Sequence, residues 1–173
     1  MFTVDTTQIN ELNKQIESIN KRGTNLEKAL DKVSEVVRED IKIRFMTAPT
    51  VEQGGIVHGG IYWKPLSQYT IRTFNRQGGQ ILTNTGALMR SLTVKEDPNH
   101  ISKFENGTFV IGTNIDYAEK HQPPNVDITS LDNNDNHLYG EIPPRPFVFY
   151  HDKLVDKISN ALEEYITTGD SYA

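Results

Sequence analysis

Residues 24–46 read TNLEKALDKVSEVVREDIKIRFM, and this stretch has a regular helical pattern. Its apolar side chains recur every three or four positions, which is the spacing of one face of an α-helix. Thr24 and Glu27 have the spacing of a capping box, and Pro49 disfavours further helix, so we expect a helix over about 25–46. The apolar face consists of Leu26, Leu30, Val33, Val37, Ile41 and Phe45.

The segment before this stretch repeats the same pattern. Its apolar residues are spaced three, four and three apart, which predicts a second helix over about 6–22. Gly23 interrupts the pattern and separates the two helices. A heptad count runs through both, so one long helix or a coiled coil remains the alternative. Phe2-Thr3-Val4 has the composition of a short strand.

Three segments have the composition of loops. Residues 47–60 and 77–80 are rich in glycine, and we expect both to be mobile. Residues 122–146 are rich in proline, asparagine and aspartate. This excursion is too long for an ordinary connection, so we expect it to serve function or to be flexible.

Shorter elements lie between these loops. Ser67 has the position of a cap for a short helix that extends to Phe74. Residues 85–91 predict a helical turn that leads into a strand, Leu92-Thr93-Val94. The clearest hairpin spans 101–112, because Asn106-Gly107 suits the positive φ angles of a type I′ turn.

The last predicted element is a helix over about 152–167, with Asp152 as its cap. Helices, then antiparallel strands, then a helix indicate one α+β domain over residues 1–173. We expect the N-terminal and C-terminal helices to pack on a small antiparallel β-sheet, with long flexible loops. The apolar face of the last helix contains Leu154, Val155, Ile158, Leu162, Tyr165 and Ile166.

Composition excludes several classes of protein. The chain of 173 residues has no cysteine, which removes disulfides, thiolate metal sites and cysteine nucleophiles. No apolar run approaches the length of a membrane helix, and no basic start precedes an apolar run. We therefore expect neither a membrane protein nor a secreted precursor.

Charge is distributed unevenly along the chain, whose net charge is −5. Residues 1–46 carry eight basic and eight acidic side chains, and residues 47–92 carry four basic and one acidic. Residues 93–173 carry six basic and fourteen acidic side chains. The basic middle segment of one copy could attract the acidic C-terminal half of another. The overall negative charge argues against a general nucleic-acid binder, which would be basic overall.

Catalytic and cofactor motifs fail on inspection. Gly54 and Gly59 have the spacing of a phosphate-binding loop, but the next residue is a glycine where a lysine is needed. Residues 132–136 begin like a calcium loop, yet His137 and Pro143 replace the turn glycine and the bidentate glutamate. We predict no catalytic residue, no metal ligand and no cofactor.

Two other functions stay open as alternatives. A small metal-dependent hydrolase would use His121, His137 and the nearby aspartates. A nucleic-acid-binding module would use Arg72, Arg76 and Arg90 together with the neighbouring aromatic residues.

The motifs after residue 60 stand in an order that resembles the phage virion morphogenesis family. They are Trp63-Lys64-Pro65-Leu66-Ser67, Ile81 to Leu92 (ILTNTGALMRSL), Val110-Ile111-Gly112-Thr113-Asn114 with Tyr117-Ala118-Glu119-Lys120-His121-Gln122, and Ile142-Pro143-Pro144-Arg145-Pro146-Phe147. The resemblance extends over nearly the whole chain. One departure is Pro123-Pro124, where the family has a short turn in place of an excursion.

The resemblance implies a structural protein of tailed bacteriophages or prophages that acts in tail completion or head–tail joining. It implies no enzyme activity and a position in the virion, at the tail–neck region, after assembly in the host cytoplasm. The matching positions that we expect to be structural anchors are Trp63, Pro65, Leu66, Ser67, Thr85, Gly86, Leu88, Ser91, Gly112, Tyr117, Ala118, His121, Gln122, Pro143, Arg145, Pro146 and Phe147.

Specific roles follow for a few of these residues. Trp63 and Leu66 are expected to anchor their loop to the core, and Gly86 and Gly112 to occupy tight backbone positions. Arg145, held between prolines, is expected to present its guanidinium to a carboxylate, within the chain or on a neighbour.

The expected partners are other copies of the chain, tail-tube proteins and neck or connector proteins. Copies would contact one another head-to-tail in a ring, hexameric by expectation. The acidic C-terminal half would face the conduit, where DNA passes without specific binding, and no membrane is involved. The candidate interface residues are Arg72, Arg76, Arg90, Asp132, Asp135 and Arg145.

Overall fold

The computed structural model describes residues 6–24, 26–105, 108–122 and 142–169, and within this part the fold is α+β, as predicted. Phe2-Thr3-Val4, the hairpin tip and most of the excursion after Gln122 lie outside the described residues. The elements in chain order are α1 (Thr6–Thr24), α2 (Leu26–Met46), β1 (Gly55–Ile56), β2 (Tyr62–Trp63), α3 (Gln68–Thr73), α4 (Ala87–Thr93), β3 (His100–Glu105), β4 (Thr108–Thr113), α5 (Ala118–His121) and α6 (Asp152–Thr168).

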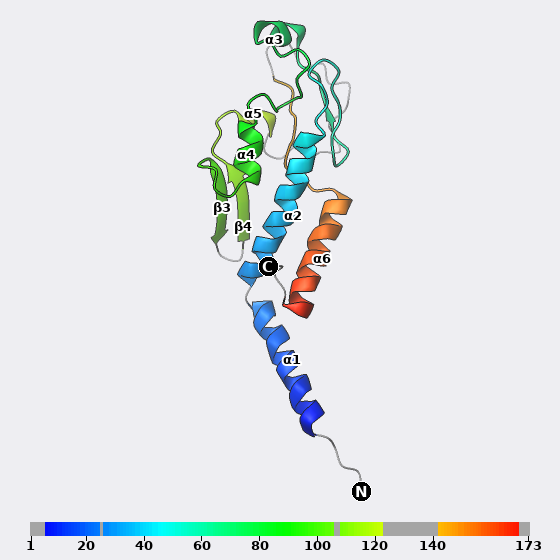
Figure 1. Ribbon diagram of the computed structural model, residues 1–173, viewed down its shortest axis with the longest axis vertical. Helices are drawn as coiled ribbons and strands as arrows, with labels where there is room; N and C mark the ends of the chain where they lie inside the picture. The colour runs from blue at the N-terminus through cyan, green and yellow to red at the C-terminus, as the bar shows by residue number, and fades with distance from the viewer. Residues whose placement is uncertain (1–5, 25, 106–107, 123–141, 170–173) are drawn as a thin grey trace.

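Helix α2 forms the axis of an elongated molecule (Figure 1). It packs against α6 on one side and against α4 on the other. The end of α2 near Met46 carries the loops and α3, and α1 extends from its other end. The helices therefore pack mainly on one another, and the strands flank them as two separate two-stranded sheets.

The hydrophobic core lies around the C-terminal half of α2. Phe45 is fully buried there, with the ring centroids of Trp63 and Phe147 each 6.0 Å from its own. Burial of one such aromatic side chain contributes about 1.5–3 kcal/mol, so this cluster is a main source of stability. Other buried members are Ile41, Val51, Val57, Ile61, Ile71, Ile81, Leu88, Leu92, Ala118 and Phe149.

The predicted hairpin is confirmed. Strands β3 and β4 pair antiparallel, with His100 opposite Thr113 and Lys103 opposite Val110. Helix α4 packs on both strands and joins them to α2. The short helix after Ser67 is also confirmed, since the Ser67 hydroxyl accepts a hydrogen bond from the backbone N–H of Thr70.

The predicted capping box at the start of α2 is wrong. Gly23 and Thr24 belong to the last turn of α1. The Thr24 hydroxyl donates back to the carbonyls of Asn20 and Lys21, so it closes the first helix in place of opening the second. Threonine forms such bonds to the preceding turn readily, and here they win over the cap.

Two predictions about the middle of the chain also need correction. Residues 92–94 do not start a strand, because α4 continues through Thr93 and its buried face includes Leu92. The glycine-rich segment 47–60 contains strand β1, which pairs with β2, and it buries Val51 and Val57 in the core. The glycine content predicted a mobile loop, but Val51 and Val57 pack in the core and hold the segment against the body.

Helix α6 matches its predicted range to within one residue, but its cap and face differ. Its N-cap is His151 rather than Asp152, and no side chain caps it. The buried positions are Leu154, Ala161 and Tyr165, whereas Val155 and Ile166 are exposed. The face is rotated because the helix packs into the angle between α2 and the end of α1. Among the described helices, none is both long enough and apolar enough to cross a membrane.

Candidate functional site: two polar anchors in the core

A buried ion pair lies inside the body near the C-terminal end of α2. Asp40 and Arg44 are one helical turn apart, and Asp40 Oδ2 lies 2.6 Å from Arg44 Nη2, with both side chains fully buried. Burial lowers the pKa of Arg44, and the Asp40 carboxylate acts in the opposite direction. A buried charge needs such a partner, because either group left alone would carry the full cost of desolvation.

The remaining donors of Arg44 bind two distant segments of the chain. Its Nε donates to the His58 carbonyl at 2.9 Å, and its Nη1 donates to the Phe147 carbonyl at 2.6 Å. The guanidinium carbon also lies 3.8 Å from the centroid of the Phe149 ring. One side chain therefore fastens the β1–β2 loop and the lead-in to α6 onto α2.

Two histidines complete this cluster at the other carboxylate oxygen. His58 Nε2 lies 2.8 Å and His151 Nε2 lies 3.0 Å from Asp40 Oδ1, and the two imidazole rings are perpendicular. We call Asp40, Arg44, His58 and His151 the Asp40 anchor. Gly59 allows this approach, because at its φ of +95° a Cβ would lie 2.6 Å from the Phe149 ring.

Asp40, His58 and His151 are close enough together to hold one metal ion. A carboxylate and two imidazoles suit a divalent transition metal. Arg44 already neutralises Asp40, however, and each imidazole can donate one N–H to Oδ1. The three atoms that would ligate an ion are thus already hydrogen-bonded to one another, and a divalent cation would add unpaired positive charge beside Arg44.

A second anchor is centred on Arg145, which is 4% exposed. Its guanidinium donates to the carbonyls of Lys64 at 3.0 Å, Pro65 at 3.1 Å and Pro143 at 3.3 Å. The expected carboxylate partner is therefore wrong: the rigid fork binds backbone carbonyls within its own chain. Burial lowers the pKa of Arg145 to about 10, so the group stays charged at neutral pH.

The neighbours of Arg145 strengthen the same junction. Trp63 Nε1 donates to the Pro146 carbonyl at 3.0 Å. Gln122 binds the backbone three times: its Oε1 accepts from the N–H groups of Phe147 and Val148, and its Nε2 donates to the Val148 carbonyl. We call Trp63, Gln122 and Arg145, with these carbonyl and N–H partners, the Arg145 anchor. Segments more than 80 residues apart in sequence meet there.

His121 lies against this second anchor but does not join a reactive set. Its backbone carbonyl accepts from the Arg145 N–H at 3.0 Å, and its buried Nδ1 has no hydrogen-bond partner among the described residues. Burial, and then the charges of Arg145 and Lys120, lower the pKa of His121 to about 4. The imidazole is therefore neutral at physiological pH. His137, the other histidine of the hydrolase alternative, lies outside the described residues.

The motif at residues 81–92 is also used for internal contacts. Gly86 is the N-cap of α4 with φ +67°, which supports its expected tight position. The Ser91 hydroxyl is buried, donates to the Leu88 carbonyl and accepts from the Thr113 hydroxyl at 2.8 Å. The expectation for Gly112 is not met, because a Cβ there would make only an ordinary contact, 3.8 Å from Ile101.

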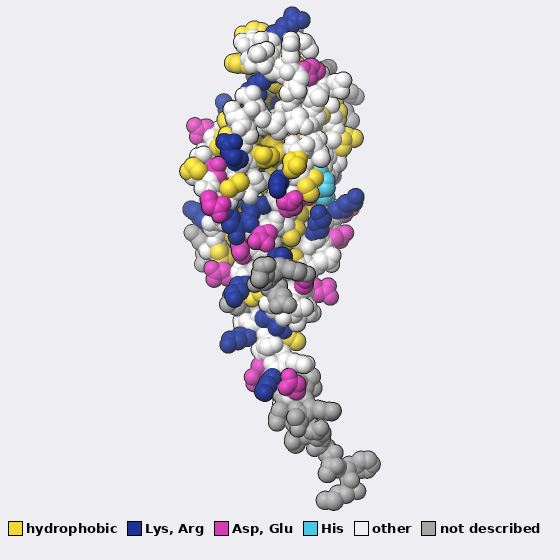
Figure 2. All heavy atoms as spheres, viewed as in Figure 1, with side chains coloured by type: hydrophobic (Ala, Val, Ile, Leu, Met, Phe, Trp, Pro, Cys, Tyr) yellow, Lys and Arg dark blue, Asp and Glu magenta, His cyan; other side chains and the backbone are white. Residues whose placement is uncertain are grey.

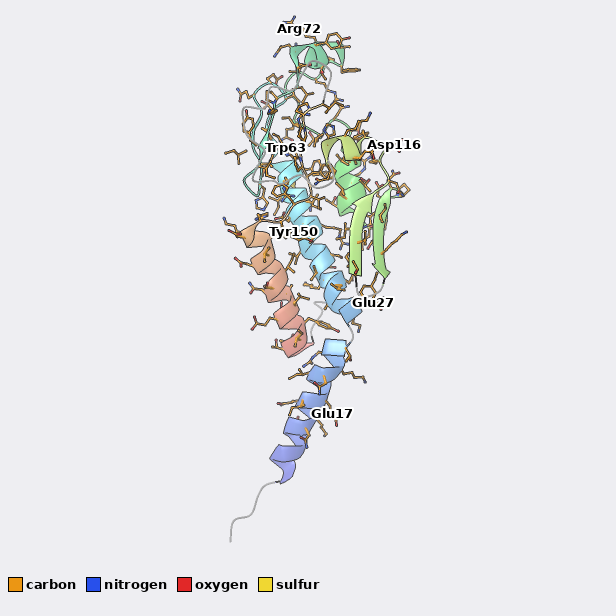
Figure 3. The ribbon with its side chains drawn as sticks, turned by 180° about the vertical axis from the view of Figure 1, so that it is seen from behind. Glu17, Glu27, Trp63, Arg72, Asp116 and Tyr150 are labelled. Carbon is orange, nitrogen blue, oxygen red and sulfur yellow. The ribbon has the colours of Figure 1, made fainter. Side chains whose placement is uncertain are left out.

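The candidate interface residues lie in different places. Arg72 belongs to α3 and Arg76 follows it, at the far end of the molecule (Figures 1 and 3). Arg90 lies on α4 and donates to the Thr85 carbonyl at 3.1 Å. Arg145 is internal, and Asp132 and Asp135 lie outside the described residues. The structure therefore leaves Arg72, Arg76 and Arg90 as surface candidates.

Two aromatic side chains near Arg72 are exposed. Tyr69 is 77% and Phe74 is 63% exposed, whereas Trp63 is fully buried. We call Tyr69, Arg72, Phe74 and Arg76 the α3 tip. Figure 2 shows hydrophobic and basic side chains together at this end. An exposed group of aromatic and arginine side chains is typical of a protein interface.

The Asp40 anchor was not predicted from the sequence, because its members are far apart along the chain. His58 is 18 and His151 is 111 positions from Asp40. One signal was present: Val37, Asp40 and Arg44 continue the three–four spacing of the apolar stripe, which places two charges where apolar residues belong. Charges on a buried helix face are buried in pairs.

A family model of phage virion morphogenesis proteins matches residues 5–167, which is nearly the whole chain. No curated protein and no solved structure matches the chain significantly.

Proposed function

The chain belongs to the phage virion morphogenesis family, and we propose that it works in tail completion and head–tail joining, without catalysis, as one subunit of a ring at the tail–neck junction. The protein would be present in the host cytoplasm during assembly and in the finished virion afterwards.

The use of the motif residues is the observation that carries this proposal. The polar side-chain groups of four motif residues form hydrogen bonds to other parts of the body: Trp63, Gln122, Arg145 and Ser91. Among the described residues, neither polar anchor contains a serine, threonine or lysine side chain that could serve as a nucleophile. Residues with such internal contacts stabilise the fold. We therefore expect the protein to act through its exposed surfaces.

The α3 tip supports an assembly role. It carries two arginines and two exposed aromatic rings at one extremity of an elongated body. The segment 47–92 to which it belongs has an excess of basic side chains, and residues 93–173 have an excess of acidic ones. We therefore place the tip against an acidic surface of the next copy, or of a tail or neck protein, in a head-to-tail contact.

The test is a phage or prophage that carries Tyr69→Ser and Phe74→Ser in this gene. Both side chains are exposed, so the variant protein should fold normally. We expect filled heads and completed tail tubes to accumulate separately, with plaque titre reduced at least a hundredfold. Electron microscopy of a labelled chain should place the label at the tail–neck junction in wild-type particles.

A matched control is Lys103→Ala, a substitution at another exposed position on strand β3. It should leave titre and particle morphology unchanged. A label along the tail tube or inside the head, or normal particles from the Tyr69/Phe74 variant, would overturn the proposed position or the proposed contact respectively.

A further inference from the structure

Helix α1 carries an apolar face that the rest of the described chain does not cover. Figures 1 and 3 show α1 running away from the body beyond the end of α6. Its described contact with the body lies at its last turn, where Arg22 Nη2 donates to the Thr167 carbonyl at 3.1 Å. Ile19 and Ile16, one and two turns earlier, are 42% and 47% exposed.

This face is the continuation of a seam that is covered inside the body. Ile9, Leu12, Ile16 and Ile19 occupy alternate a and d positions of a heptad pattern. The same register continues in α2 as Leu26, Leu30, Val33 and Val37. The last three are half-buried, because α2 packs against α6 and α4. The apolar stripe thus extends beyond the helices that cover it.

The residues beside the seam fit a second copy of the same helix. Among the flanking e and g positions, Asn13, Gln15 and Asn20 carry no charge, and the charged Arg22 is bound to the Thr167 carbonyl of α6. Charged side chains at such positions usually select a different, complementary partner, and like charges there would repel an identical one. The charged residues Glu11, Lys14, Glu17 and Lys21 lie on the other faces of α1.

We propose that α1 pairs with α1 of a second copy through its apolar stripe, of which Ile16 and Ile19 are the described side chains, and so ties neighbouring copies together. The pairing is a contact between copies distinct from the α3 tip, and it does not depend on where in the particle the protein works. Two heptads form a short interface, so the pairing is weak in the free protein and gains from other contacts between copies.

The absence of cysteine makes a direct test possible, because a single introduced thiol is the only one in the chain. Ile16→Cys in the otherwise natural full-length protein would be treated with a short bismaleimide crosslinker at high protein concentration. Lys14→Cys, on the opposite face of the same helix, is the matched control. We expect covalent dimer from Ile16→Cys in at least fivefold excess over the control.

Sedimentation provides a second measurement. Ile16→Asp with Ile19→Asp should weaken self-association at least tenfold, while the thermal unfolding midpoint of the body stays unchanged because both positions are exposed. Equal crosslinking from both faces, no covalent dimer, or crosslinks in particles only to a different protein would overturn the pairing. The α3-tip experiment can succeed or fail independently of this result.

Discussion

The two ends of α2 are held by different physical means. Near Met46, the Asp40 and Arg145 anchors join segments that are as much as 80 to 111 residues apart, around a core of buried aromatic rings. Near Leu26, α1 is attached to α6 by contacts of its last turn and leaves isoleucines exposed. The first end is a rigid body, and the second is an arm that gains little stability from its own chain.

This difference separates positions that determine stability from positions that determine assembly. A substitution in an anchor should unfold the body, whereas a substitution on α1 or on the α3 tip should leave the body folded and change its contacts. Three measurements test this division.

Asp40→Ala should have the largest effect. It leaves the Arg44 guanidinium buried without its carboxylate and removes the acceptor of both histidines. Breaking a buried pair in this way costs about 3–5 kcal/mol in the free energy of unfolding. Urea denaturation followed by circular dichroism measures this loss.

The control for Asp40→Ala is Asp31→Ala. Asp31 pairs with Lys95 at 2.7 Å, but both side chains are substantially exposed. A surface ion pair contributes about 0–1 kcal/mol, so this variant should unfold close to the wild type. Similar losses in the two variants would contradict the role of the buried anchor.

His121→Gln should change the pH dependence of stability. The folded protein holds the pKa of His121 at about 4, below its ordinary value of 6.5. As the pH falls from 6.5 towards 4, His121 is protonated in the unfolded chain but remains largely neutral in the folded chain. The free energy of unfolding therefore decreases over this pH range. Glutamine does not titrate, and it should remove about 2 kcal/mol of this loss.

Urea unfolding of wild type and His121→Gln at pH 7, 5.5 and 4.5 checks the prediction. The two stabilities should converge or cross as the pH decreases. A constant difference between the two proteins at all three pH values would show that His121 does not titrate with the expected low pKa.

Gly23→Ala should have the smallest effect, and it should be favourable. Gly23 is helical in α1, and a Cβ there would meet nothing within 4 Å. Alanine should stabilise α1 by about 0.5–1 kcal/mol and raise the helical signal, without moving the unfolding midpoint of the body. Gly86→Ala is the counterpart with the opposite sign, because φ is +67° there.

Local patterns predicted the elements whose signal is local. The spacing of Leu30, Val33 and Val37 predicted α2, and Asn106-Gly107 predicted the hairpin. Local reasoning failed at Thr24, where two equally local hydrogen bonds compete, and at residues 92–94, where burial of Leu92 keeps the chain helical.

The two anchors could not be predicted in the same way. Arg145 has no local feature that distinguishes a carboxylate partner from three carbonyls, because its partners depend on where Lys64 and Pro65 lie in the fold. The resemblance to a family identified Trp63, Gln122 and Arg145 as important positions, but only the structure shows that they bind one another's segments.

The Arg145 anchor also fixes both ends of the excursion that begins at Pro123. The Arg145 N–H binds the His121 carbonyl, and Gln122 binds the backbone at Phe147 and Val148, so the chain leaves and returns at one fastened point. The entropic cost of closing a loop rises only slowly with its length. We therefore expect that sequence can be added, exchanged or removed between these fixed ends without disturbing the body. A phage lineage can therefore adapt this segment to new neighbours while the fold stays the same, and an experimenter can insert an epitope tag at the same place.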